Sequence, residues 1–171
     1  METWDAIRAR RNVRTYLPDP VSAADLDRIA EAAWRAPSAS NRQEWNFIVV
    51  TDRDQLQALS TVWQGARHIA GAAAAIALVV PQYDEERRLL TSRYDLGQAT
   101  YAMMLAAADL GIGTGHSSVG DQERAREILG VPADHDVAYL IGIGHPADRP
   151  LKPIQKPDRL PFDEVVRRGH W

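Results

Sequence analysis

The segment that begins at Ser92 or Asp95 and ends at Leu110 constrains the fold most, because it has the composition of a helix and almost no polar face. Ala, Met, Leu and Tyr make up most of its surface in every direction, and Gly111 ends it. A helix that is apolar nearly all round has no side to turn toward water. We therefore expect it either at the centre of the molecule or shared with a second copy of the chain.

Shorter elements are interleaved around this segment without a strict strand–helix–strand rhythm. Apolar periodicity and capping residues predict further helices over residues 3–10, 22–36, 51–62 and 121–129, beginning at Thr3, Ser22, Thr51 and Asp121. β-Branched and aromatic residues predict strands over residues 45–50, 76–80, 114–119 and 137–144. This mixture is typical of the α+β class, with a sheet covered by helices.

The 171 residues are expected to form one domain, because 45% apolar residues supply an ordinary globular core. Residues 145–171 carry five prolines and have no apolar core of their own, so we expect no regular element there. Burying this tail and the apolar helix against a twin would remove exposed apolar surface. The sequence therefore predicts a homodimer in which the tail wraps the partner subunit.

Composition and charge exclude several classes of function. The chain has no cysteine, which excludes disulfides, thiolate nucleophiles, iron–sulfur clusters and zinc–thiolate sites. A net charge of -3 gives no field that would attract nucleic acid, and the longest apolar run, residues 69–80, is too short to cross a bilayer. No residue pair has metal-ligand spacing, and the first residues lack the pattern of a secretory signal. We expect a cytoplasmic protein with no metal, nucleic-acid or membrane partner.

Gly111, Gly113 and Gly115 form a glycine cluster that could suggest a nucleotide site. The cluster follows a helix rather than a strand, and no acidic residue stands at a suitable distance downstream to bind a ribose. These features exclude a dinucleotide-binding Rossmann motif.

Arg10-Arg11-Asn12-Val13-Arg14 follows the first expected helix and concentrates guanidinium groups. Their paired donors match phosphate oxygens, and Asn12 adds a neutral donor. A solvated basic turn explains the same residues, and for this segment alone that simpler interpretation is favoured.

Pro37-Ser38-Ala39-Ser40-Asn41-Arg42-Gln43-Glu44-Trp45 is a loop dense in hydroxyl and amide donors that leads into an expected strand. Such donors can bind the polar edge of a flavin ring or its ribityl hydroxyls. An ordinary turn is the alternative, since Ser and Asn favour turns for local reasons. The tail segment Lys156-Pro157-Asp158-Arg159 adds two cations, which alone are typical of a charged surface tail.

Taken in order, four segments resemble the nitroreductase-like FMN oxidoreductase family. They are the arginine segment at residues 10–14, the loop from Pro37 to Phe47, Gly111-Ile112-Gly113-Thr114 after the long helix, and Lys156 to Val166. The loop is the most specific of them. The resemblance extends over nearly the whole chain and implies the nitroreductase fold: a central, mostly antiparallel sheet flanked by helices in an intertwined homodimer.

The chain departs from the family pattern at three places. Asn12 replaces the usual serine, Glu44 replaces the usual proline, and Gly115-His116 stands where larger residues are common. An acid beside the loop bears on the choice of acceptor more than on FMN binding.

The resemblance also implies which residues hold FMN. Arg10 and Asn12 would bind the phosphate or ribityl end, with Arg11 beside them, and Arg14 would reach the N1/O2 edge, where a cation stabilises reduced flavin. The remaining implied contacts are Pro37, then Ser38, Ser40 and Asn41 from the partner subunit, the backbone of Ser117, Ser118 and Val119, and Lys156 and Arg159 on the phosphate. Gln64, Arg67 and His68 align only loosely with another flavin-edge contact, and His68 and His116 could border the substrate pocket.

The implied activity is hydride transfer from NAD(P)H through FMN to a small organic acceptor such as a nitroaromatic or a quinone, with no catalytic residue from the protein. Family variants that use F420, reduce enones, modify flavin or dehalogenate are the alternative. A non-enzymatic module that binds nucleic acid through Arg8, Arg10, Arg11 and Arg14 is disfavoured by the acidic overall charge. The sequence does not choose between NADH and NADPH.

Overall fold

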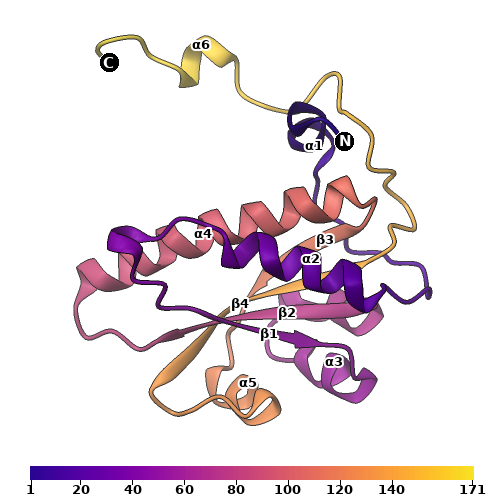
Figure 1. The fold of residues 1–171 in the computed structure, drawn as a ribbon, viewed down its shortest axis with the longest axis vertical. Helices are drawn as coiled ribbons and strands as arrows, with labels where there is room; N and C mark the ends of the chain where they lie inside the picture. Colours follow the sequence, from indigo (N-terminus) through magenta and orange to yellow (C-terminus); the bar gives the residue numbers. More distant parts are fainter.

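The computed structural model describes residues 1–171 as a four-stranded antiparallel sheet with helices on both faces (Figure 1). The strands are β1 (Asn46–Val50), β2 (Ala74–Pro81), β3 (Gly113–Ser118) and β4 (His135–Gly144), in the order β1-β2-β4-β3. The helices are α1 (Thr3–Ala9), α2 (Ala23–Trp34), α3 (Arg53–Leu59), α4 (Glu86–Asp109), α5 (Gln122–Leu129) and α6 (Phe162–Val165), with 3-10 segments η1 (Ala39–Asn41) and η2 (Gln64–Gly71). The expected α+β class is confirmed.

The two central strands are apolar and the two outer strands are shorter. β2 is buried over nearly its whole length and pairs with β1 and β4, with a register shift between Leu78 and Val79. β3 pairs only with β4 and therefore lies at an edge of the sheet. The outer side of β3 is available to other segments of the chain.

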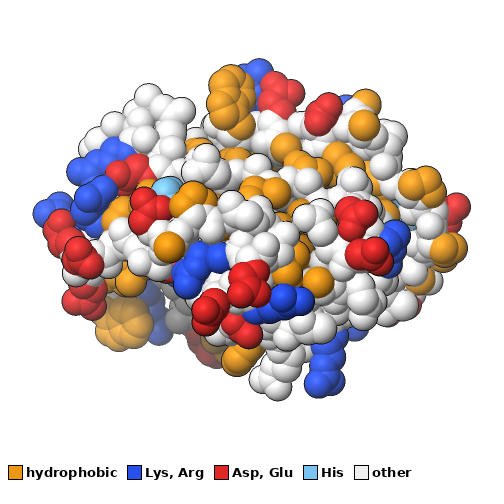
Figure 2. Space-filling view, turned by 90° about the horizontal axis from the view of Figure 1, so that it is seen from below, with side chains coloured by type: hydrophobic (Ala, Val, Ile, Leu, Met, Phe, Trp, Pro, Cys, Tyr) orange, Lys and Arg blue, Asp and Glu red, His pale blue; other side chains and the backbone are white.

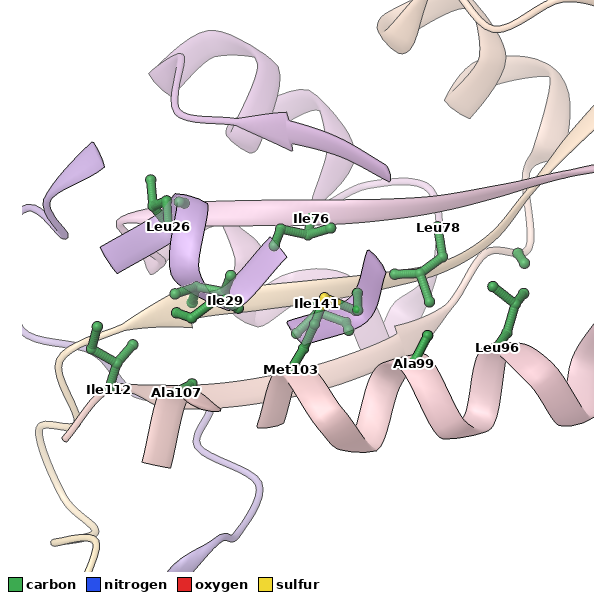
Figure 3. Close-up of a cluster of buried hydrophobic side chains, with 14 of the residues drawn as sticks. Leu26, Ile29, Ile76, Leu78, Leu96, Ala99, Met103, Ala107, Ile112 and Ile141 are labelled. Carbon is green, nitrogen blue, oxygen red and sulfur yellow. The ribbon is translucent and has the colours of Figure 1, made fainter. Parts of the chain in front are cut away.

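One core lies between the sheet and the pair α2 and α4 (Figure 3). Ile29 of α2 and Met103 of α4 meet Ile76 of β2 there, and all three side chains are fully buried. Along α4 the buried positions Leu96, Ala99, Met103 and Ala107 recur at helical spacing. Burying one large aliphatic side chain contributes about 1.5–3 kcal/mol, so this stripe fixes α4 against the sheet.

A second core lies on the opposite face, under α3, α5 and η2. Leu56 and Leu59 of α3, Ile69 of η2 and Ala125 of α5 pack on Leu140 of β4. The segment η2 was not expected from the sequence. No helix combines the length and apolarity that a bilayer crossing requires.

Two expected helix starts are wrong. The N-cap of α1 is Glu2 rather than Thr3, and Asp52 rather than Thr51 caps α3 by accepting a hydrogen bond from the Gln55 N–H at 2.9 Å. At α3 a carboxylate is as good a cap as a hydroxyl, so the pattern leaves the choice between neighbours open, whereas no side chain caps α1. The cap at Ser22 is confirmed, because its hydroxyl accepts from the Asp25 N–H at 3.1 Å.

The long helix also differs from the expectation. α4 begins at Glu86 instead of Ser92 or Asp95, because residues 86–91 contain good helix formers and no breaker. Its polar residues Ser92 and Asp95 are buried, whereas Tyr94 is 72% exposed. The exposed residues are thus aromatic and aliphatic at Leu90, Tyr94 and Tyr101, and charged in the first turn, residues 86–88.

The tail contains one short helix, which corrects the expectation of no regular element. α6 follows Pro161 and forms a single turn, with the Val166 N–H donating to the Phe162 carbonyl at 2.8 Å. Proline is compatible with the start of a helix, because its missing N–H would have no partner there. The yellow tail leads away from the sheet past α1, and α6 makes no packed core of its own (Figure 1).

Candidate functional site

The arginine segment runs along the free edge of β3. The Val13 N–H donates to the Thr114 carbonyl at 2.8 Å, and Asn12 forms a parallel bridge with Thr114. A Cβ on Gly113 would lie 2.8 Å from the Val13 side chain, and a Cβ on Gly115 would lie 2.4 Å from the Val13 carbonyl oxygen. Gly113 and Gly115 are therefore needed so that the arginine segment can lie closely against the edge of the strand.

Two polar atoms of this segment are buried without a hydrogen-bond partner, Arg10 Nε and Asn12 Oδ1. The Arg10 guanidinium lies 5.7 Å from the centre of the Tyr101 ring, and its Nη1 reaches the Met104 sulfur at 3.6 Å, which is a weak acceptor. Buried polar atoms in proteins are nearly always paired, so each of these two atoms is a candidate partner for a polar group of a ligand.

A recess opens beside Arg10, between α4 and the β3–β4 edge. Its volume is about 340 Å³, within the range of small-molecule sites. The lining includes Arg10, Arg93, Tyr101, His116 and Tyr139 and contains no carboxylate. The combination of two guanidinium groups and aromatic rings suits an anionic ligand with a planar ring.

The two histidines near the arginine segment have lowered pKa values. Burial is the main cause for His116, followed by the positive charges of Arg14 and Arg10. Burial also lowers the pKa of His68, and Arg14 adds to this effect. Both rings are therefore neutral at neutral pH, and the arginines supply the positive potential of the site.

His68 and Tyr16 fasten the segments around the site. His68 Nε2 lies 2.9 Å from the Gly115 carbonyl oxygen and Nδ1 lies 3.0 Å from that of Gly65, which ties η2 to β3. Tyr16 donates its hydroxyl hydrogen toward the Val13 carbonyl at 2.8 Å. Burial raises the pKa of Tyr16, so the hydroxyl stays neutral and remains a donor.

Backbone donors to FMN are expected from Ser117, Ser118 and Val119 at the end of β3. Of these, the N–H of Ser118 faces the free edge of the sheet. The Thr114 carbonyl faces outward to Val13, and alternation along a strand turns the Ser118 N–H to the same side. The same alternation directs the Ser117 N–H toward β4, and the Ser117 hydroxyl donates to the Ser118 carbonyl at 2.9 Å. Val119 follows the strand.

The donor loop, residues 37–45, adopts an unusual backbone held from both ends. Ser40, Asn41 and Gln43 have φ values of 53°, 54° and 54°, in the left-handed region that disfavours side chains. Asp95 accepts a hydrogen bond from the Ala39 N–H at 3.0 Å.

Glu44, one of the departures from the family pattern, holds the other end of the donor loop. Its carboxylate pairs with Arg88 at 2.6 Å and accepts from the Tyr83 hydroxyl at 3.3 Å. The acid is thus engaged by α4 and its approach rather than pointing freely at a substrate.

The donor loop and Arg10 sit at different places along α4. The loop is fixed at Asp95, whereas Arg10 contacts Met104. Nine residues of helix separate these two anchors, or about 14 Å along the axis. Within one chain the structure does not bring Pro37, Ser38, Ser40 and Asn41 to the arginine segment.

The tail begins beside the arginine segment and then leaves it. The Arg11 guanidinium donates to the carbonyl oxygens of Ala9 and Lys152, and Arg8 Nη2 donates to Gln155 Oε1 at 2.9 Å. Arg11 thereby anchors the tail. Beyond this anchor the cations Lys156 and Arg159 are exposed, and Arg159 donates only to the neighbouring Asp158 carbonyl.

Comparisons with known proteins show which family the chain belongs to. A sequence profile of the Nitroreductase family matches residues 7–66 and 60–145, which is most of the chain. The chain belongs to the nitroreductase family. A protein of Archaeoglobus fulgidus named for NADH dehydrogenase and NAD(P)H nitroreductase is 34% identical across 99% of both chains. The FMN reductase (NAD(P)H) of Bacillus subtilis is 31% identical across 96% of this chain and 72% of its own length.

Solved structures confirm the nitroreductase fold. The FMN-dependent nitroreductase from Clostridium difficile R20291 superimposes with a TM-score of 0.85 at 24% identity, over 98% of this chain and 99% of that chain. The family resemblance expected from four short segments is thus confirmed for the chain as a whole.

Sequence reasoning missed three residues of the candidate site. Tyr101 and Met104 contact Arg10, but in the sequence they are indistinguishable from other apolar positions of the long helix. Asp95 was considered only as a helix start. A buried carboxylate within an otherwise apolar helix is a signal that it binds a partner, and here the partner is the donor loop.

Proposed function

We propose that this chain is an FMN-dependent oxidoreductase that transfers hydride from NAD(P)H to a small organic acceptor such as a nitroaromatic or a quinone. The names of its relatives, which include an FMN reductase that uses NAD(P)H, support the cofactor and the donor. The fit of the chain to FMN rests on the unpaired buried atoms Arg10 Nε and Asn12 Oδ1 beside a carboxylate-free recess. When bound, FMN supplies the redox chemistry by accepting and then passing on a pair of electrons.

The protein's own residues bind and orient in this proposal. Arg10 and Asn12 hold the phosphate or ribityl end, and Arg14 adds a positive charge at the ring edge, which favours the reduced, negatively charged ring. The free Ser118 N–H on the edge of β3 serves as a backbone donor to the ring. Lys156 and Arg159 lie on the tail beyond the anchor at Gln155, and the family resemblance assigns both cations to the phosphate.

A homodimer completes the site in this proposal. The single observation that carries it is the separation of the donor loop from Arg10 along α4, because two antiparallel copies of α4 would bring the loop of one chain to Arg10 of the other. Leu90, Tyr94 and Tyr101 form an exposed apolar row on α4, at 62%, 72% and 41% exposure, that such a partner would cover. The tail beyond Gln155, which has no core of its own, would wrap the partner subunit.

An absorbance spectrum followed by anaerobic titration tests this function. The protein is expected to be yellow as purified, or after incubation with FMN, and to bleach when NADH or NADPH is added. Reoxidation by a quinone should restore the colour. A protein that stays colourless with excess FMN contradicts the proposal, and a bound flavin that neither nicotinamide reduces points to a variant with another donor.

A further inference from the structure

A second hollow lies where the donor loop meets the first turns of α4, away from the recess at Arg10. Its volume is about 500 Å³, and its lining side chains are Ser40, Arg42, Glu85, Arg87, Arg88 and Thr91. Almost all of the lining is polar, which distinguishes this hollow from an apolar substrate pocket. Nothing in the proposed flavin contacts uses these arginines.

The charges in this hollow are unevenly balanced. Arg88 is neutralised by Glu44 at 2.6 Å, but the guanidinium groups of Arg42 and Arg87 have no hydrogen-bond or ion-pair partner in the protein. Among the lining residues, Glu85 opposes one of these two charges and leaves one positive charge in excess, while Glu86 of the first helical turn lies outside the lining. Guanidinium groups match the oxygens of a phosphate, and two of them without a protein partner line this one hollow.

The N-terminus of α4 adds to this attraction. No side chain caps the helix, so the N–H groups of its first turn have no side-chain acceptor. A helix of this length presents a partial positive charge at that end. The Ser40 hydroxyl, held in a left-handed backbone conformation, supplies a further donor at the rim.

The position of the hollow relates it to the active site. Arg87 precedes Leu90 by three residues and Tyr94 by seven, so it continues the exposed apolar row of α4 by one turn. In the proposed dimer, the hollow therefore lies at the end of the shared face. It borders the same donor loop that reaches the partner's flavin.

We propose that this hollow binds the phosphate monoester of a substrate during turnover. This inference rests on the proposed function, because it assumes that the donor loop lies beside the reacting flavin. Two substrates of such an enzyme carry that group. NADPH has a 2′-phosphate that NADH lacks, and free FMN as an acceptor has a 5′-phosphate that riboflavin lacks.

The test compares substrates that differ only in this phosphate, using Arg42→Gln, Arg87→Gln and the double variant. With an uncharged quinone as acceptor, kcat/KM is measured for NADPH and for NADH. With NADH as donor, kcat/KM is measured for FMN and for riboflavin. In the double variant, kcat/KM for one of the two phosphorylated substrates, NADPH or FMN, is expected to fall about ten- to a hundredfold, the effect of charged hydrogen bonds. The value for the matching substrate without the phosphate, NADH or riboflavin, should stay the same.

Arg124→Gln is the matched control, because it also removes one exposed positive charge. Arg124 lies on α5, on the other side of the sheet from α4. On the face of the molecule seen from below, Lys and Arg are interspersed with Asp and Glu without a field of one sign (Figure 2). This control should leave all four values unchanged.

The outcomes separate this proposal from the function on which it rests. If both members of each pair change alike in the double variant, or none changes, the hollow is not a phosphate site. Calorimetric binding of NADP⁺ and NAD⁺ gives a readout that needs no turnover: the wild-type preference for NADP⁺ should disappear in the double variant if the donor is the ligand. Absence of bound FMN in the wild type would instead contradict the proposed function.

Discussion

The carboxylate of Asp95 accepts a hydrogen bond from the Ala39 backbone N–H at 3.0 Å and joins the donor loop to α4. Asp95 is only 8% exposed, so this contact takes the place of water around a buried charge. The loop it holds contains three side-chain-bearing residues in left-handed conformations, and such backbone strain persists only where surrounding contacts fix it. Asp95 therefore acts as a positioning residue for the loop.

Replacing this carboxylate should loosen the donor loop and weaken FMN binding. In Asp95→Ala the loss of a charged hydrogen bond is expected to cost about 2 kcal/mol in loop positioning, and the FMN dissociation constant should rise by about tenfold or more. Asp95→Asn keeps an acceptor oxygen and should recover part of the affinity. Flavin fluorescence titration measures both constants. Equal FMN affinity in Asp95→Ala and the wild type would contradict this role.

Removing the guanidinium of Arg10 should affect the flavin directly. Arg10→Ala is expected to raise the FMN dissociation constant by about ten- to a hundredfold, the effect of a charged hydrogen bond. Arg10→Lys keeps the charge but not the paired donors, so its FMN dissociation constant should lie between those of the wild type and Arg10→Ala. Arg28→Ala removes an exposed arginine that pairs with Asp109 and serves as the control. If Arg10→Ala bound FMN as tightly as the wild type, Arg10 would not be a contact of the FMN phosphate.

A methyl group at Gly115 should disturb the close contact between β3 and the arginine segment. Its Cβ would lie 2.4 Å from the Val13 carbonyl oxygen, so Gly115→Ala is expected to cost about 1–3 kcal/mol of folding free energy. Gly71→Ala is the matched control, because nothing lies within 4 Å of a Cβ there. Denaturant unfolding compares the two variants. Equal stability would show that the segment moves aside at no cost.

The lowered pKa of His68 predicts a pH dependence of stability. Its folded-state pKa lies below the ordinary value of 6.5, so the unfolded chain binds the proton more readily. Stability from this group is present above pH 6.5 and is lost as the pH falls below that value toward the folded-state pKa.

The free energy of unfolding of the flavin-free protein, measured from pH 7.5 to 5, should therefore fall less steeply in His68→Gln than in the wild type. The comparison isolates this residue, because the His116 contribution and those of the carboxylates are common to both proteins. Parallel curves for the two proteins would show that folding leaves the pKa of His68 unchanged.

Much of the fold follows from local sequence patterns. The Ser22 cap, the apolar run of β2 and the glycine stop after the long helix each depend on nearby residues, and each is confirmed. The start of α3 differs because the neighbouring Asp52 can cap as well as Thr51, whereas α1 and α4 begin without any side-chain cap. The one-turn helix α6 is too short to leave a periodic pattern.

The candidate site was only partly predictable. The residue types of the arginine segment and the donor loop identified both segments, because the chemistry of phosphate binding is visible in single side chains. The contact between Arg10 and Tyr101, and that between Asp95 and Ala39, join residues more than 50 positions apart. No local pattern encodes such contacts. The sequence did not show what the glycines do; in the structure, Gly113 and Gly115 leave room for Val13.

Subunit complementation tests the central claim, that each flavin site takes Arg10 from one chain and the donor loop from another. An Arg10→Ala chain and a chain with Ser38→Ala and Asn41→Ala are expected to be poor in flavin and activity when pure. After unfolding and refolding as an equal mixture, half of the dimers are mixed and each has one intact site, so about a quarter of the wild-type flavin and activity should return. A mixture no better than its two components would contradict the claim.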